Sequence, residues 1–441
     1  MAIKIGMASL GCPKNQVDAE IMLATLENAG YELVADENEA EVIIVNTCGF
    51  IESAKQESID TILDLASLKD EGNLKKIIVT GCLAQRYSND LAENIPECDG
   101  IVCLGKNGDI VDVIQKVLAD EQKVFEAPVC DMPLDGDRVL CNEPYFAYLK
   151  ISEGCNNRCT YCAIPGIRGE MRSRPMEEIV AEAKVLANRG VKELVVVAQD
   201  TTRYGEDIYG ALMLPELLQK LCEIENIKWI RILYAYPNRI TDKLIEVIRD
   251  NEKIVKYLDM PIQHCNGDVL KSMNRPGNKE ELTTLIKKIR KEIPDIVLRS
   301  TVMVGFPTEG EKEFEELCEF VKDIRFERLG CFAYSPEEDT PAAEMEQLDE
   351  EICINRQEIL MSQQTLIAES IAEEMSGKRL DVLVEGYDTY IKHFYGRCYM
   401  DAPDVDCKVF FTAKGKKQVG EFVKVEITDT LDLDLLGKEC D

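Results

Sequence analysis

The chain has 441 residues, of which 45% are hydrophobic, and 82 acidic against 51 basic residues give a formal net charge of −31. Its length predicts two or three domains, each able to bury a core. The negative charge repels phosphate backbones, which argues against bare nucleic acid as the principal partner and favours a basic protein. A generically acidic protein would carry the same charge. No apolar run reaches the roughly 18 residues that a membrane span needs.

The chain contains eighteen cysteines and no recognisable secretory leader. In a reducing compartment cysteines serve as metal ligands and as small buried hydrophobes, and disulfides are rare. We therefore expect a cytoplasmic protein in which some of the cysteines hold a metal centre.

Residues 1–125 alternate short apolar runs with helical patterns, and we expect them to form the first domain. The expected strands are 3–10, 41–46, 76–80 and 101–104. Helices are expected at 18–29, 51–68, 84–94 and after residue 107, the first with Asp18 as its N-cap and Gly30 as its stop. Continuous Val and Ile runs between helices predict a parallel α/β sheet that is buried on both faces.

Cys12, Cys48 and Cys82 each follow directly after one of these strands, and each has a glycine beside it. The carboxyl ends of parallel strands meet at one edge, where ligands bind, and glycine lets the backbone approach a bulky ligand. The repeated position predicts that the three cysteines share one iron–sulfur cluster. Three buried core cysteines are the alternative. Other cysteines in this part of the chain match no such pattern and are interpreted as structural: Cys98, Cys103, Cys130 and Cys141.

Residues 126–144 are rich in Pro and Asp and are interpreted as a linker into a second domain, 140–370. The expected strands of that domain are 147–151, 193–198, 229–234, 255–260, 297–304 and 328–333. Helical patterns fill the gaps between them, including 177–188, 215–223, 241–250, 279–291 and 311–326. Six strand–helix units predict a partial (βα)6 barrel of the TIM type.

Three cysteines follow the first strand of this barrel: Cys155, Cys159 and Cys162, a CxxxCxxC pattern within eight residues. Three thiolates on one loop can hold three irons of a 4Fe–4S cluster and leave the fourth iron open to another ligand. A structural zinc site would need a fourth ligand, usually from a second CxxC or from paired histidines. The chain has only two histidines, His264 and His393, so the cluster is favoured over zinc.

Polar or glycine residues lie in or after the later strands of the barrel: Gln199, Gln263, Arg299, Thr301 and Gly305. Barrel enzymes place their chemistry at the carboxyl ends of the strands, so these residues are candidate cofactor ligands. Ordinary loop and cap residues are as common at such positions. Gly305 is the strongest candidate, because a glycine lets the backbone approach a ligand closely.

The tail, residues 375–441, follows a charged amphipathic helix expected at 349–375 and changes to short β runs. The clearest runs are 379–385, 408–411 and 422–427, and aromatic and turn residues separate them, which predicts a small five-stranded barrel of the OB type. The tail has thirteen acidic and ten basic residues. This balance suits a Lys/Arg-rich protein better than RNA.

Four strings carry a resemblance to a known family: SLGCPKNQVDAE, VNTCGFI, VTGCLAQRY and GCNNRCTYCAIPGIRGEMRSRP. They resemble the radical S-adenosylmethionine (SAM) methylthiotransferases, and the tail resembles the TRAM module. The resemblance implies that SAM chelates the open iron of the cluster on Cys155, Cys159 and Cys162. It also implies that Cys12, Cys48 and Cys82 hold an auxiliary 4Fe–4S cluster that provides or carries sulfur. Gly305 would lie against the adenosyl part of SAM, with further SAM contacts from Gln199, Gln263, Arg299 and Thr301.

Four more stretches, AQDTTRYG, YLDMPIQH, TVMVGFPTE and FAYSPEEDTPA, are similar to one branch of the family. That branch adds a methylthio group to the β-carbon of an aspartate in ribosomal protein S-twelve. The branch that acts on tRNA tends to have Gln-Met where this chain has Pro13-Lys14. One departure is Thr308, which stands where the family usually has glycine.

The resemblance also implies partners. We expect ribosomal protein S-twelve, in or outside the small ribosomal subunit, and an electron donor such as a flavodoxin or ferredoxin. We expect no membrane association and no direct tRNA binding. Two alternatives stay open: an enzyme that methylthiolates a tRNA adenosine, and a non-catalytic iron–sulfur protein that transfers electrons or binds RNA.

Overall fold

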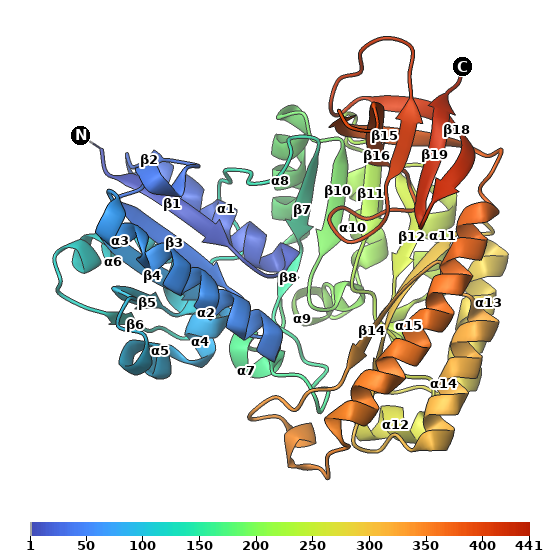
Figure 1. The fold of residues 1–441 in the computed structure, drawn as a ribbon, viewed down its shortest axis with the longest axis horizontal. Coiled ribbons are helices and arrows are strands. Elements are labelled where there is room, and N and C mark those ends of the chain that lie inside the picture. Colours follow the sequence, from blue (N-terminus) through green and yellow to red (C-terminus); the bar gives the residue numbers. More distant parts are fainter. Residues whose placement is uncertain (1) are drawn as a thin grey trace.

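The computed structural model describes residues 2–441, which form two six-stranded sheets, a closed five-stranded barrel and one short two-stranded sheet (Figure 1). The N-terminal sheet lies beside the β7 edge of the central sheet, and helix α1 contacts strand β7. No helix among residues 2–441 has the length and apolar character to cross a bilayer.

The N-terminal sheet is parallel and has the order β2-β1-β3-β4-β5-β6. Its Val and Ile runs bury side chains on both faces, for example Ile43 and Val45 on one and Val42 and Ile44 on the other, as the sequence predicts. Its strands are β1 (Lys4–Ser9), β2 (Glu32–Leu33), β3 (Val42–Thr47), β4 (Lys76–Gly81), β5 (Gly100–Val102) and β6 (Val124–Phe125).

Helix α1 begins at Pro13, five residues before the predicted start, so the assignment of Asp18 as its N-cap is wrong. Cys12 occupies the cap position with an extended backbone, and proline is favoured in the first turn because it lacks the N–H that would be unpaired there.

The predicted helix 84–94 is two helices, α4 and α5. The helices of this domain are α1 (Pro13–Asn28), α2 (Glu52–Ala66), α3 (Leu68–Glu71), α4 (Cys82–Arg86), α5 (Ser88–Asn94) and α6 (Ile110–Leu118).

The central sheet has six parallel strands in the order β14-β13-β12-β11-β10-β7, which confirms the predicted partial barrel. Alternate residues of β13 face opposite sides, with Leu298 and Val302 packed on the helices and Val297 on the concave face. The strands are β7 (Phe146–Lys150), β10 (Glu193–Val197), β11 (Trp229–Ile232), β12 (Ile254–Asp259), β13 (Val297–Val304) and β14 (Arg328–Ala333).

Amphipathic helices cover the convex side of this sheet and bury their apolar faces against it. The short strands β8 (Ser152–Glu153) and β9 (Arg172–Ser173) pair beside it. The helices of this region are α7 (Ile164–Arg168), α8 (Met176–Asn188), α9 (Glu206–Tyr209), α10 (Leu214–Cys222), α11 (Asp242–Asp250), α12 (Gly267–Ser272), α13 (Lys279–Glu292), α14 (Glu311–Ile324) and α15 (Glu350–Glu373).

The tail closes into a barrel of order β15-β16-β17-β19-β18, which confirms the predicted five-stranded barrel. Val382 and Phe411 of this barrel pack against the concave face of the central sheet, where Tyr257 and Val297 lie. The strands are β15 (Arg379–Asp388), β16 (His393–Arg397), β17 (Val409–Thr412), β18 (Phe422–Leu431) and β19 (Asp434–Glu439).

The segment predicted as a linker, 126–144, is fixed to both domains by Arg138. Its guanidinium is buried and forms ion pairs with Glu20 of α1 and, at 2.7 Å, with Glu182 of α8. Of the four cysteines interpreted as structural, Cys98 and Cys103 are buried, whereas Cys130 and Cys141, both in this segment, are exposed.

Candidate functional site

The CxxxCxxC loop runs from β8 to α7, and the pairing of β8 with β9 closes its base. Gly154 precedes Cys155 with φ of 79°, and a Cβ atom there would lie 2.2 Å from the carbonyl oxygen of Glu170. Only glycine fits this position without a shift. The backbone N–H of Cys155 then donates to Gly169 at 3.1 Å, which holds the start of the loop against its end.

The three thiols of this loop line one cavity of about 600 Å³, which helix α4 of the N-terminal domain borders with Gln85 and Arg86. Burial raises the pKa of the Cys155 thiol and raises that of Cys162 to about 12. Cys159 has two polar neighbours: the Nη1 atom of Arg275 lies 3.7 Å from its Sγ atom and the Tyr236 hydroxyl lies 4.0 Å away.

Cys12, Cys48 and Cys82 come together at the carboxyl edge of the N-terminal sheet, after β1, β3 and β4. Gly11 has φ of 95°, and a Cβ atom there would lie 3.0 Å from the Cβ atom of Cys48. Gly81 has φ of 97° and lies against the backbone of Thr47. Glycines therefore let these loops approach one another.

The thiols of this second set differ in their electrostatic surroundings. Burial raises the pKa of Cys12, but the nearby cations of Lys14 and Arg168 outweigh it, and the net effect is a lowered pKa. Burial raises the pKa of Cys82 to about 11, partly offset by Arg168, and also raises that of Cys48. Lys14 is itself buried and lies 3.5 Å from the ring centre of Tyr234 in the barrel.

Both sets consist of free thiols. Among residues 2–441, no three Cys, His, Asp or Glu side chains are close enough to hold a single metal ion. A 4Fe–4S cubane needs a wider triangle, because each thiolate binds a different iron. Two sets of three soft sulfur donors therefore fit iron–sulfur clusters better than zinc.

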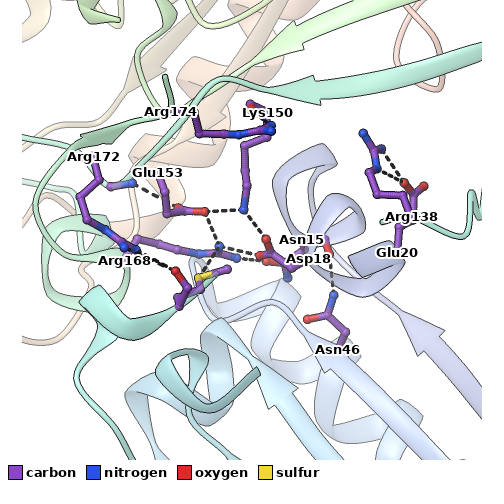
Figure 2. A network of polar contacts seen from close by, with 12 residues as sticks. Asn15, Asp18, Glu20, Asn46, Arg138, Lys150, Glu153, Arg168, Arg172 and Arg174 are labelled. Carbon is purple, nitrogen blue, oxygen red and sulfur yellow. Dashed lines mark hydrogen bonds and ion pairs between the residues drawn. The ribbon is translucent and has the colours of Figure 1, made fainter. Parts of the chain in front are cut away.

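A buried ionic network joins the two domains (Figure 2). The Nη1 atom of Arg168 lies 2.7 Å from Asp18 of α1 and 3.1 Å from Glu153 of β8. Lys150 of β7 forms ion pairs with the same two carboxylates, at 2.9 Å with Glu153. All four side chains are at most 2% exposed.

Analysis of the sequence missed this network. Two signals were available: Lys150 is a charged residue within the otherwise apolar strand β7, and Arg168 lies inside the motif that carries the family resemblance. Burial raises the pKa of Glu153, but the positive charges of Arg168 and Lys150 reverse this, so its pKa lies well below the ordinary range.

Of the five predicted SAM ligands, Gln199 and Gln263 follow the carboxyl ends of their strands, and Thr301 lies within β13. Gln199 follows β10 and donates from Nε2 to Glu153 at 2.5 Å, which places it in the ionic network. Gln263 follows β12 with φ of 69°, and its N–H donates to the carbonyl of Thr301 at 2.9 Å. The side chains of Gln263 and Thr301 are both half-buried.

The other two predicted ligands have protein partners. Arg299 forms an ion pair with Asp259 at 3.2 Å and another, with Asp406 of the tail, at 3.6 Å. Gly305 has φ of 75°, and a Cβ atom there would lie 2.3 Å from the Sγ atom of Cys353 on α15. The close approach that requires glycine at position 305 is therefore an approach to helix α15.

A second cavity, of about 820 Å³, lies between the Cys12 loop, the start of β7 and the tail barrel. Tyr145, Tyr148 and Tyr395 line it, together with four carboxylates and two cations: Glu143, Glu385, Asp404, Asp406, Arg397 and Lys408. The Cys12 end of the second thiol set is thus open to a groove in which acidic residues outnumber basic ones.

Comparison with known families divides the chain into three parts. Residues 4–103 match the family described as uncharacterized protein family UPF0004, residues 149–321 match the radical SAM superfamily, and residues 377–439 match the TRAM domain. The radical SAM match contains Cys155, Cys159 and Cys162, and this superfamily implies a 4Fe–4S cluster and SAM. The UPF0004 match contains Cys12, Cys48 and Cys82.

Two relatives cover almost the whole chain. The chain is 51% identical to the ribosomal protein uS12 methylthiotransferase RimO of Lachnoclostridium phytofermentans, over 99% of both chains. It is 50% identical to that of Clostridioides difficile, over 99% of this chain and 98% of the relative. The fold resembles that of the radical SAM methyltransferase TsrM from Kitasatospora setae, with a TM-score of 0.59 and 13% identity over 78% of this chain and 77% of that one. The chain therefore belongs to the RimO family of radical SAM methylthiotransferases.

Proposed function

We propose that the protein adds a methylthio group to the β-carbon of an aspartate in ribosomal protein uS12, the S-twelve protein of the small ribosomal subunit. One observation carries the proposal: two separate sets of three free thiols occur in two domains that a buried ionic network joins, in a chain about half identical to uS12 methylthiotransferases. One set lies on the radical SAM loop and the other at the edge of the N-terminal sheet.

The reaction explains why two sets of thiols are needed, because it breaks a C–H bond and also supplies a sulfur atom. A β-carbon C–H bond of aspartate is not acidic enough for an ordinary side-chain base, so general-base chemistry does not suit the reaction. When bound, a reduced 4Fe–4S cluster with SAM supplies a carbon radical that removes this hydrogen, and a second cluster supplies the sulfur, which SAM methylates. The expected small products are methionine, 5′-deoxyadenosine and S-adenosylhomocysteine.

The residues of this chain bind and orient these groups. Cys155, Cys159 and Cys162 would hold the first cluster in the cavity that they line, and because burial raises the pKa of the Cys162 thiol, cluster binding there releases its proton. Cys12, Cys48 and Cys82 hold the second cluster. SAM would lie along the carboxyl ends of the strands, with contacts from Gln199, Gln263 and Thr301, whereas Arg299 is paired with Asp259 and Gly305 lies against α15.

The groove beside Cys12 is the entry path for the target loop. Its carboxylates and the net charge of −31 attract a basic ribosomal protein and repel bare RNA. The aromatic side chains that line it, including Tyr145 and Tyr395, offer apolar contacts to a peptide. A flavodoxin or ferredoxin provides the electron.

The test is anaerobic incubation of the reconstituted enzyme with purified uS12, SAM and a reductant, followed by mass spectrometry of the peptides. The proposal predicts one methylthio group in place of one hydrogen at a single aspartate, together with 5′-deoxyadenosine. Retained modification of tRNA adenosine with none of uS12 would assign the chain to the other branch. Failure to cleave SAM under reduction would indicate a non-catalytic protein.

A further inference from the structure

Arg168 reaches from the radical SAM loop to a ligand of the other thiol set. It is the last residue of α7, the helix that follows Cys162, and its side chain is 2% exposed. Its Nε atom lies 3.3 Å from the Sγ atom of Cys82, within the range of an N–H···S hydrogen bond. Ile167, the neighbouring residue, packs against Cys82 as well.

Other contacts fix the orientation of this guanidinium. Nη1 binds Asp18 and Glu153, and Nη2 donates to the amide oxygen of Asn15 (Figure 2). Because the guanidinium is planar and its donors form a rigid fork, these contacts leave Nε directed at the sulfur.

A purely structural role for Arg168 does not account for the contact with sulfur. Arg168 and Lys150 balance the charges of Asp18 and Glu153, so the network is neutral without any thiolate. Buried ion pairs of this kind add little net stability. An arginine that only linked the two domains could form a bidentate pair with one carboxylate. Here the Nε–H of Arg168 is instead directed at Cys82.

We propose that Arg168 is a positioning residue that donates a hydrogen bond to the Cys82 thiolate of the second cluster and thereby raises the reduction potential of that cluster. This inference rests on the proposed function, which places a cluster on Cys12, Cys48 and Cys82. Hydrogen bonds to cluster sulfurs stabilise the more negatively charged reduced state, so they move the potential upward. The same contact ties the second cluster to the loop that carries the first.

The test uses full-length protein in which Cys155, Cys159 and Cys162 are all replaced by alanine, so that only the second set remains. After anaerobic reconstitution, the midpoint potential is measured by electron paramagnetic resonance at controlled potentials. Arg168→Lys keeps the positive charge and removes the Nε–H. Arg174→Lys is the matched control, because Arg174 is as buried and its partners are Glu182 and the carbonyl of Lys150.

We expect Arg168→Lys to lower the reduced-to-oxidised ratio about tenfold at a fixed potential, which for one electron is a shift of about 59 mV to more negative values. Arg174→Lys should leave the midpoint unchanged. If burial of a lysine prevents folding, the charge-balanced pair Arg168→Gln with Asp18→Asn removes the same hydrogen bond and should shift the midpoint in the same direction.

Two results would overturn the inference, and they are distinguishable. If the alanine background binds about four irons and Arg168→Lys leaves its midpoint unchanged, the hydrogen bond does not tune the cluster, and the proposed function stands. If the alanine background binds no iron, the second cluster itself is refuted, and the inference is refuted with it.

Discussion

At the scale of single residues, the cysteines fall into groups that burial alone does not separate. Cys82 and Cys98 are both buried, and burial raises the pKa of each thiol. Of these two, only Cys82 has an arginine donor at its sulfur and two further thiols beside it. Position on the sheet edge, rather than burial, therefore distinguishes the predicted ligand Cys82 from Cys98.

The first prediction separates a ligand cysteine from a core cysteine. Cys155→Ala should abolish 5′-deoxyadenosine formation, because two thiolates do not hold the radical SAM cluster in place. Cys98→Ala is the control: its thiol lies in the apolar core of the N-terminal domain, and its loss should cost about 1–2 kcal/mol of stability while deoxyadenosine formation continues. Chromatographic measurement of 5′-deoxyadenosine formed by the two variants tests this prediction. Unchanged formation in Cys155→Ala would reject the assignment of the first set.

The second prediction concerns Gly305. Gly305→Ala places a Cβ atom 2.3 Å from the Cys353 sulfur at a φ of 75°, so it combines backbone strain with overpacking. Gly377→Ala has a similar φ of 79° and nothing within 4 Å, so it isolates the strain, about 1–2 kcal/mol. Gly305→Ala should cost about 1–3 kcal/mol more.

Thermal unfolding of the two glycine variants without cofactors measures this difference. The excess cost at position 305 should shrink when Cys353 is also replaced by glycine, because that change removes the Cβ and Sγ atoms in the way. Equal melting temperatures for Gly305→Ala and Gly377→Ala would contradict the close contact with α15.

At the scale of elements, several ion pairs join the tail barrel to the central sheet, and one of them is centred on a buried carboxylate. Glu193, the first residue of β10, lies 2.7 Å from Arg231 on β11 and 2.8 Å from Arg397 on β16 of the tail. All three side chains are at most 3% exposed. Burial raises the pKa of Glu193, but the two arginines outweigh it and the net effect is a lowered pKa.

This lowered pKa predicts how stability changes with pH. A carboxylate whose folded pKa lies below its unfolded value of about 4.3 contributes stability above that value and loses it as the pH falls through the folded pKa. Glu193→Gln should therefore destabilise the protein by about 3–5 kcal/mol at neutral pH. The difference in stability between this variant and the unaltered protein should become smaller below about pH 4. Melting temperatures of cofactor-free protein across this range measure the effect.

Glu252→Gln serves as the control for this series, since Glu252 is exposed and on the surface of the barrel domain. Its melting temperature should follow that of the unaltered protein at every pH. If the melting temperature of Glu193→Gln stays equally far below that of the unaltered protein as the pH falls, the ion pairs with Arg231 and Arg397 do not depend on the carboxylate charge.

Most elements could be predicted because their signals are local. The Val and Ile runs of β3 and β4 and the amphipathic patterns of α11 and α14 show directly in the sequence. The start of α1 could not be predicted, since Asp18 looks like a cap and only tertiary contact with Arg168 and Lys150 reveals it as a buried mid-helix carboxylate. Strands β16 and β19 were missed because their polar and glycine residues mask short apolar runs.

The candidate site likewise contains some residues that local patterns predict and others that they do not. The six cysteines could be found because CxxxCxxC and the repeated glycine–cysteine pairs are local patterns. The residues that bind SAM depend on which side chains face the cavity, and two of the five predicted ones, Arg299 and Gly305, have contacts with Asp406 and Cys353, which are distant in sequence. Such pairs are set by the packing of the tail and of α15, which no local pattern encodes.

At the scale of the whole molecule, both interfaces of the central barrel contain buried charges. Arg168 and Lys150 link it to the N-terminal domain, and Arg397 links it to the tail. A further ion pair joins the N-terminal domain to the central domain near the radical SAM cavity, where Arg86 of α4 lies 2.8 Å from Glu337. The three parts are thus held in a fixed arrangement, and the two thiol sets are held with them.

The measurement that tests this account most directly is the iron content of reconstituted protein. The unaltered chain should bind about eight irons, and each of two variants should bind about four, one with alanine at Cys155, Cys159 and Cys162 and the other with alanine at Cys12, Cys48 and Cys82. About four irons in the unaltered chain, with no loss on replacing Cys12, Cys48 and Cys82, would contradict the claim that this chain holds two clusters.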